Sequence, residues 1–194
     1  RYINFMHDNL GDKLKDKEYV EIRDYMLNMK ALGSMRLLQF AGKAAHTSNV
    51  MAYNCSYIAP TCWQDFAEIV YVLMCGAGLG FSIEEQTIGQ LPIIKRQSKE
   101  KSATWVIPDS REGWADALAL GLKTWASGKD IIFDYSELRP RGARLKTTGG
   151  RSSGPDPLRN LLSFTRERML TRQGRRLKTI DAHDIICKIG EVVV

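Results

Sequence analysis

The stretch that decides the fold is "NCSYIAPTCWQDFAEIVYVLMCGAGLGFSIEE", residues 54–85. It opens with a run of β-forming residues that ends at Pro60, and this run predicts a mostly buried strand. Apolar residues then recur at the spacing of one helix face: Phe66, Ile69, Val70 and Leu73. Glycines follow and lead into a second short run of β-formers. The order strand, helix, strand predicts a βαβ-like unit and therefore an α/β protein.

Further elements are predicted on both sides of this unit. Helices are expected within residues 16–32, 114–125, 159–176 and 179–194, a strand within 130–138, and a polar connection over 88–108. Capping-box patterns precede two helices, as Thr61 with Gln64 and as Asp109 with Glu112, and Thr179 or Asp181 is expected to cap the last helix.

The composition is typical of a globular protein. Of 194 residues, 44% are hydrophobic and 26% charged, no apolar run is long enough to span a membrane, and the first residues do not form a signal peptide. We therefore expect a cytoplasmic protein. The four cysteines form no C-x-x-C pair and the three histidines lack metal-ligand spacing, so neither a disulfide framework nor a metal site is expected.

The net charge of +6 is concentrated in one segment. Residues 139–176 carry eleven Arg and Lys against two acidic residues, a net +9, while the remainder carries 17 against 20, a net −3. This segment points to a phosphate-bearing partner. For residues 159–176 alone, an amphipathic helix with a solvated basic face is an equally good interpretation, because apolar residues interleave with the charges.

Three features carry candidate chemistry, and each has more than one interpretation. Gly76, Gly78 and Gly80 follow a helix and precede a strand, the reverse of a Rossmann motif, so they indicate only a close approach of backbone to a ligand or to another strand. Cys55 is either an inert buried residue or a redox thiol whose partner lies far away in the sequence. The other three cysteines fit an inert, buried role better.

The segment "LKTTGGRSSGP", residues 145–155, combines glycines, hydroxyls and cations, a mixture that suits phosphate oxygens. It does not match a P-loop, so the residues alone predict only nucleotide or polynucleotide binding. A stable nucleic-acid complex is not expected, because Phe164 is the only aromatic residue between 136 and 176.

Taken in order, several segments resemble the monomeric, adenosylcobalamin-dependent (class II) ribonucleoside-triphosphate reductases. They are "NCSYIA", "LMCGAGLGFSIE", "VIPDSREGWADAL", "FDYSELRPRGARLKTTGGRSSGPDPL" and "DIICKIGEVVV". The resemblance implies the first half of a ten-stranded α/β barrel with an effector-site insertion. It divides the chain into an N-terminal helical segment, residues 1–48, and barrel residues 49–194, truncated at 194.

The resemblance also implies roles for individual residues. Cys55 matches a cysteine that becomes part of a redox-active disulfide. Asn54, Ser56, Ala77 and Gly78 match positions at the substrate. The effector and specificity loop would comprise Lys146, Thr147, Thr148, Gly149, Gly150, Arg151, Ser152, Ser153 and Gly154, and its glycines would let it take different shapes with different effectors.

The implied reaction is radical-based, allosterically regulated reduction of ribonucleoside triphosphates to deoxyribonucleotides for DNA synthesis. The implied partners are adenosylcobalamin, held mostly by the other half of the enzyme, a deoxynucleotide effector and a thioredoxin-type reductant, in the cytoplasm of a cell or of a phage host. The family's Asn-x-Cys-x-Glu segment does not occur in these residues, so the 194-residue chain alone is expected to be inactive and cut from something longer. The alternatives are a non-catalytic basic module that binds nucleotides or RNA, and an oligomerising scaffold.

Overall fold

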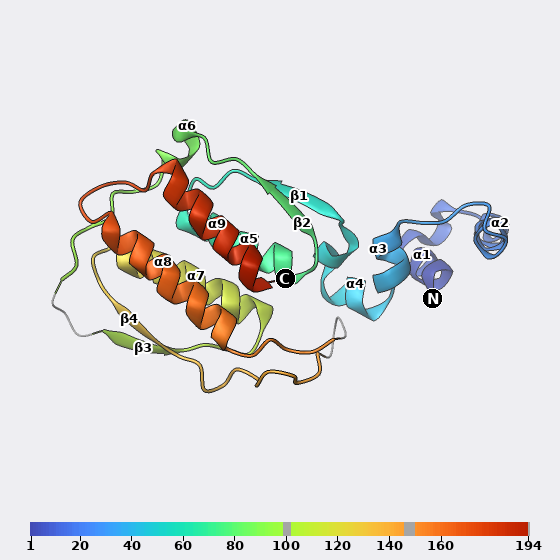
Figure 1. The fold of residues 1–194 in the computed structure, drawn as a ribbon. Helices are drawn as coiled ribbons and strands as arrows, with labels where there is room; N and C mark the ends of the chain where they lie inside the picture. Colours follow the sequence, from blue (N-terminus) through green and yellow to red (C-terminus); the bar gives the residue numbers. More distant parts are fainter. Residues whose placement is uncertain (99–101, 146–149, 194) are drawn as a thin grey trace. The chain divides into compact units, whose positions relative to one another are not determined.

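The computed structural model describes residues 1–98, 102–145 and 150–193 (Figure 1). Its contacts divide the chain into two compact units. The smaller unit comprises Arg1–Asn54 together with Cys75–Ala77, and the larger comprises Cys55–Met74 and Gly78–Val194. The predicted boundary at residue 48 stays a prediction.

The smaller unit is helical. Its elements are α1 (Tyr2–Leu10), η1 (Gly11–Lys13), α2 (Asp16–Leu27), α3 (Met35–Phe40), α4 (Lys43–Thr47) and η2 (Asn49–Ala52). At the start of α2, the carboxylate of Glu18 accepts a hydrogen bond from the backbone N–H of Lys15 at 2.7 Å, which satisfies one of the donors that a helix start leaves unpaired. The predicted helix within residues 16–32 is confirmed, although it ends at Leu27.

The larger unit begins with the predicted strand, helix and strand: β1 (Cys55–Ile58), α5 (Trp63–Met74) and β2 (Gly78–Phe81). The two strands are parallel neighbours. The helix start is not the expected capping box, because the carboxylate of Asp65 accepts from the backbone N–H groups of Thr61 and Cys62, at 2.6 and 2.9 Å. Burial acts to raise the pKa of Asp65, but these hydrogen bonds outweigh it and lower that pKa.

A second parallel pair follows, made of β3 (Ala103–Val106) and β4 (Ile131–Asp134), with α7 (Arg111–Ala126) between them in sequence. The prediction that residues 88–108 form only a polar connection is wrong. The segment contains β3 and the last residue of α6 (Glu85–Ile88), and it buries apolar side chains at Leu91, Ile94 and Ile107.

The start of α7 also differs from its prediction. Ser110, rather than Asp109, is the N-cap, and its hydroxyl accepts from the backbone N–H of Gly113 at 2.9 Å.

Four long helices form the centre of the larger unit, with β1 and β2 on one side and β3 and β4 on the other (Figure 1). They are α5, α7, α8 (Asp156–Thr171) and α9 (Thr179–Val193), and their facing side chains form one apolar core. The carboxylate of Asp181 accepts from the backbone N–H of Lys178 at 2.9 Å, which confirms one of the two caps proposed for α9. Within the described residues, no helix is both long and apolar enough to cross a lipid bilayer.

Candidate functional site

The side chain of Cys55 is exposed at the start of β1. Cys55 pairs with Gly78 across the two strands, and Tyr57 pairs with Gly80. Paired positions in neighbouring strands project towards the same face, so the two glycines leave both side chains uncovered. For this reason the expectation of a mostly buried strand is wrong, and burial alternates along β1 instead.

Ser56 ties the two strands together next to this thiol. Its hydroxyl donates a hydrogen bond to the carbonyl oxygen of Gly78 at 3.0 Å. The hydroxyl oxygen still has lone pairs with which to accept a hydrogen bond from a ligand. The structure therefore brings together Cys55, Ser56 and Gly78, and their contact with a substrate stays a prediction.

Two further residues predicted at the substrate, Asn54 and Ala77, belong to the smaller unit. The side-chain oxygen of Asn54 accepts from Nε of Arg36 at 3.2 Å, and Arg36 also donates to the carbonyl oxygen of Gly76. Gly76 has a φ of 81°, a left-handed conformation that favours glycine. Ala77 is only 3% exposed, so its side chain is not available to a ligand in this unit.

The remaining cysteines do not share one environment. Cys75 is buried, as expected, whereas Cys62 and Cys187 are exposed, so the expectation that both are buried is wrong. The sulfur of Cys187 lies 3.5 Å from Nε2 of His183 on the same helix. Among the described residues, no group of three or more His, Cys, Asp or Glu side chains is arranged to hold a metal ion.

The described residues of the basic, glycine-rich segment pair as a hairpin. Residues 141–145 run antiparallel to residues 150–153, with a bridge between Arg144 and Arg151. Backbone hydrogen bonds of 2.7 and 2.8 Å join the N–H of Ser152 to the oxygen of Ala143, and the N–H of Gly142 to the oxygen of Ser152. We call residues 139–145 with 150–154 the hairpin stem. Four residues predicted in the specificity loop lie outside the described residues: Lys146, Thr147, Thr148 and Gly149.

The predicted loop residues that are described, Gly150 to Gly154, all belong to this stem. The φ angles of Gly150 and Gly154 are 86° and 80°, so both turns require a residue that tolerates a left-handed conformation. A side chain at Gly154 would crowd the backbone of Arg141, which shows that the two sides of the stem are closely packed there. Nη1 of Arg151 donates to the carbonyl oxygen of Gly142 at 3.0 Å, across the same stem.

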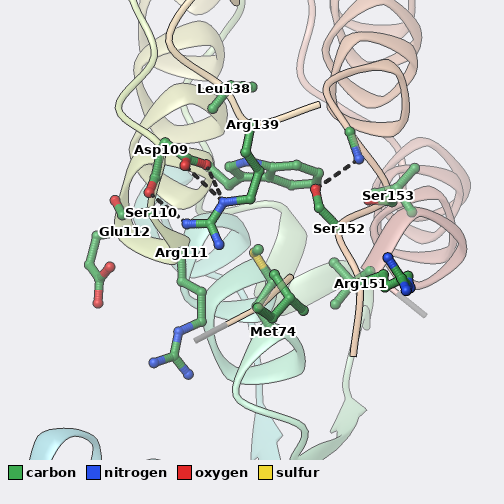
Figure 2. Close-up of a pocket in the computed structure, with 15 residues that line it drawn as sticks. Met74, Asp109, Ser110, Arg111, Glu112, Leu138, Arg139, Arg151, Ser152 and Ser153 are labelled. Carbon is green, nitrogen blue, oxygen red and sulfur yellow. Dashed lines mark hydrogen bonds and ion pairs between the residues drawn. The ribbon is translucent and has the colours of Figure 1, made fainter. Parts of the chain in front are cut away.

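A cavity of about 450 Å³ lies against this stem (Figure 2). Residues from the start of α7, the stem, and the ends of α5 and α9 line it: Met74, Asp109, Ser110, Arg111, Glu112, Trp114, Leu138, Arg139, Leu145, Arg151, Ser152, Ser153, Gly154, Val192 and Val193. Among the described residues, its lining combines three arginines and two carboxylates with serine hydroxyls, one indole ring and aliphatic side chains. Arginines and hydroxyls suit the phosphates of a nucleotide, and an indole ring suits its base.

Arg139 joins the hairpin stem to the start of α7. Its Nε donates to both carboxylate oxygens of Asp109, at 3.0 and 2.8 Å, and its Nη2 lies 3.5 Å from the backbone oxygen of Asp109. The two side chains are 32% and 34% exposed, so the ion pair is within reach of a ligand in the cavity. Figure 2 shows both side chains at its wall.

The arginines of α8 have a different role. Its apolar face is buried, and four arginines on or just after it pair with nearby carboxylates: Arg159 with Asp156, Arg166 with Asp130, Arg168 with Asp184, and Arg172 with Asp181. The hydrogen bonds from Arg166 lower the pKa of Asp130. The packing of this helix therefore confirms the amphipathic interpretation for residues 159–171, whereas residues 172–176 lie beyond the helix.

The sequence does not predict the cavity. "DSREGW" predicts a helix start, but its position beside the stem depends on a contact between residues thirty positions apart in the chain. The sequence offers one signal. Asp109 opens the motif "DSREGW", Arg139 opens "RPRGARLKTTGG", and the two side chains carry opposite charges.

Comparisons with known proteins identify a matching family model and similar proteins. Residues 84–167 match the model of the "B12-dependent ribonucleotide reductase, insertion domain". An adenosylcobalamin-dependent ribonucleoside-triphosphate reductase of Euglena gracilis is 31% identical over 147 residues, which cover 73% of this chain and 20% of the relative. The enzyme of the same name from Lactobacillus leichmannii is 32% identical over 157 residues, covering 63% of this chain and 21% of the relative.

The fold agrees as well. The crystal structure of a B12-dependent (class II) ribonucleotide reductase superposes with a TM-score of 0.82 at 24% identity, covering 100% of this chain and 36% of that one. This confirms the predicted fold class, part of an α/β barrel with an insertion. The chain spans about a fifth to a quarter of the length of the curated relatives that it matches. From the insertion-domain match, the relatives and the shared fold, we conclude that the chain belongs to the adenosylcobalamin-dependent, class II ribonucleotide reductases.

Proposed function

We propose that the polypeptide containing these residues reduces ribonucleoside triphosphates to deoxyribonucleotides, with Cys55 as one of its two reducing thiols. The observation that carries this proposal is the exposed thiol of Cys55 opposite Gly78, at the start of two parallel strands. A reducing thiol must reach both the sugar and a second thiol, and an exposed sulfur beside a residue without a side chain permits both approaches.

The chemistry balances with two thiols. The 2′ carbon–oxygen bond of the ribose breaks, the oxygen leaves as water, and a carbon–hydrogen bond forms in its place. The two hydrogens come from two thiols, which are oxidised to one disulfide. Cys55 supplies one thiol, and the second belongs to a part of the polypeptide outside these residues. A thioredoxin-type protein would return the disulfide to thiols, and we place the reaction in the cytoplasm.

Ser56 and Gly78 would help to position the sugar. The Ser56 hydroxyl donates to the carbonyl of Gly78, so its oxygen can accept a hydrogen bond from a ribose hydroxyl. The absence of a side chain at Gly78 allows the substrate to approach the backbone closely. Asn54 and Ala77 are the neighbouring positions in sequence, and we propose that they contact the substrate mainly through an amide side chain and backbone groups, respectively.

Adenosylcobalamin is the cofactor named for the relatives, and it supplies radical chemistry when bound. The cavity beside the hairpin stem does not fit it. Its volume is about 450 Å³, and three arginines and two carboxylates line it beside apolar side chains, whereas a corrin is a broad ring whose faces need a larger, less charged surface. We therefore assign cofactor binding to other parts of the polypeptide and derive no step through it.

We further propose that the cavity beside the hairpin stem receives a deoxynucleoside triphosphate effector. Its size lies within the range of small-molecule sites. Arg111 and Arg151 are placed to attract phosphates, and Trp114 offers a ring for the base. Because the cavity adjoins the stem, effector binding there would change the conformation of the specificity loop, Lys146 to Gly154, and so the choice of substrate.

The test compares Cys55→Ser with wild type in the polypeptide encoded by the complete reading frame. Cys62→Ser is the matched control, because Cys62 is also exposed but follows β1. The proposal predicts that Cys55→Ser abolishes multiple turnover while nucleotide binding is retained, and that Cys62→Ser has no effect. Unchanged steady-state turnover in Cys55→Ser would remove Cys55 from the mechanism, and nucleotide binding without any turnover in wild type would favour a non-catalytic module.

A further inference from the structure

The ion pair of Asp109 and Arg139 joins two elements that are each held firmly. On one side, Asp109 directly precedes the N-cap of α7, where Ser110 accepts a hydrogen bond from Gly113 at 2.9 Å. The backbone is tight here, because a side chain at Gly113 would overlap the carbonyl oxygen of Pro108. Asp109 is therefore a fixed point at the start of a sixteen-residue helix.

On the other side, Arg139 is the first residue of the hairpin stem. Beyond it, the stem is held by its own backbone hydrogen bonds and by Arg151 on the oxygen of Gly142. We expect such a ladder to move as a unit, so that a displacement of Arg139 would be passed along the stem towards residues 145 and 150. The hydrogen bonds to Asp109 thus link the stem directly to the start of α7.

The same guanidinium also lines the cavity. Its described hydrogen bonds to Asp109 use Nε and Nη2, and within the described residues Nη1 makes none. Arginine binds phosphate at least as well as carboxylate, because a phosphate offers three oxygens and more negative charge. A partly exposed ion pair contributes little to stability, so a phosphate in the cavity can compete with Asp109 for Arg139.

We infer that Asp109 and Arg139 form a latch that phosphate opens. In the free protein, Asp109 holds Arg139 and therefore the hairpin stem against α7. When the phosphates of a nucleotide enter the cavity, they replace the Asp109 carboxylate as the partner of Arg139, and the stem is released to a second position. Asp109 and Arg139 are thus positioning residues that couple effector binding to the loop. This inference rests on the proposed role of the cavity as the effector site.

The experiment measures the affinity of the full 194-residue chain for inorganic tripolyphosphate by calorimetry. The proteins are wild type, Asp109→Asn, Arg139→Gln and the double variant. Glu112→Gln is the matched control, because it removes one negative charge from the same cavity without breaking the ion pair. Circular dichroism establishes whether each variant is folded. If Arg139→Gln is not folded, Arg139→Lys replaces it, because lysine keeps the positive charge but lacks the guanidinium N–H donors.

We expect Asp109→Asn to bind tripolyphosphate about threefold to tenfold more tightly than wild type, because the competing carboxylate is gone. Arg139→Gln should bind about tenfold more weakly. In a protein that already carries Arg139→Gln, adding Asp109→Asn should increase the affinity for tripolyphosphate no more than Glu112→Gln increases it in wild type. Without Arg139 there is no latch to open.

Two results would overturn the latch. In the first, Asp109→Asn increases the affinity for tripolyphosphate no more than Glu112→Gln does, or increases it equally with and without Arg139. Asp109 then acts only through its charge, and the cavity binds the effector without a latch. If wild type does not bind tripolyphosphate at all, both the latch and the effector cavity are wrong, while the proposal for Cys55 is unaffected.

Discussion

Cys55 and Gly78 lie opposite each other in the parallel pair of β1 and β2, and the glycine leaves the thiol uncovered. The exposure of this sulfur therefore depends on a residue that is twenty-three positions away in the sequence. Replacing Gly78 should change what can reach Cys55 without changing Cys55 itself.

Gly78→Val should slow the alkylation of Cys55 by iodoacetamide roughly tenfold, because an isopropyl group beside the sulfur restricts access. Peptide mass spectrometry separates this rate from those of Cys62 and Cys187. Gly80→Val is the control, since it lies opposite Tyr57 and its Cβ would meet nothing closer than 3.9 Å. Equal rates in both variants would show that Gly78 does not control access to the thiol.

Gly113→Ala should lower the free energy of unfolding by about 1–3 kcal/mol, because the new methyl group overlaps the carbonyl oxygen of Pro108 at the start of α7. Gly190→Ala is the matched substitution in α9, where nothing lies within 4 Å of the added carbon. It should stabilise the chain by about 0.5–1 kcal/mol through helix propensity. Urea unfolding measures both changes, and a destabilised Gly190→Ala would contradict the packing described for α9.

Asp130→Asn should destabilise the chain by about 1–3 kcal/mol at pH 7, because the carboxylate accepts from Nε of Arg166 and Nε1 of Trp125, at 2.9 and 3.1 Å. The pKa of Asp130 is lowered in the folded chain, chiefly by Arg166. Its stabilising contribution is therefore complete above the unfolded-state pKa and is lost as the pH falls through the lower, folded-state pKa.

Thermal unfolding between pH 2 and pH 7 measures this contribution. The difference between wild type and Asp130→Asn should shrink as the pH falls. Asp156→Asn should differ little from wild type at any pH, since Asp156 is 76% exposed and, within the described residues, pairs only with Arg159 on its own helix. A difference for Asp130→Asn that does not depend on pH would contradict the assigned ion pair.

The sequence predicted those elements whose signals are local. The apolar spacing in residues 63–74 predicted α5, and the β-formers on both sides predicted β1 and β2. β3 was missed, because four residues after a polar stretch become a strand only through pairing with β4, some thirty positions further on. Both expected capping boxes were wrong for a local reason: Asp65 and Ser110 offer competing oxygens one residue away from the predicted ones.

The candidate site was only partly predictable. The glycines and Cys55 were visible in the sequence, but the exposure of the thiol follows from strand register, which residue patterns did not specify. Similarly, the excess of arginines predicted a phosphate partner without showing that those of α8 pair with carboxylates while Arg111, Arg139 and Arg151 line a cavity. Contacts between residues far apart in the sequence decide both the exposure of the Cys55 thiol and which arginines line the cavity.

The most direct test of the central claim is a single-turnover experiment without external reductant, followed by disulfide mapping of the complete polypeptide. The account predicts one disulfide for each deoxyribonucleotide formed, with the peptide that contains Cys55 as one of its two partners. Formation of product while Cys55 remains a free thiol would contradict the account.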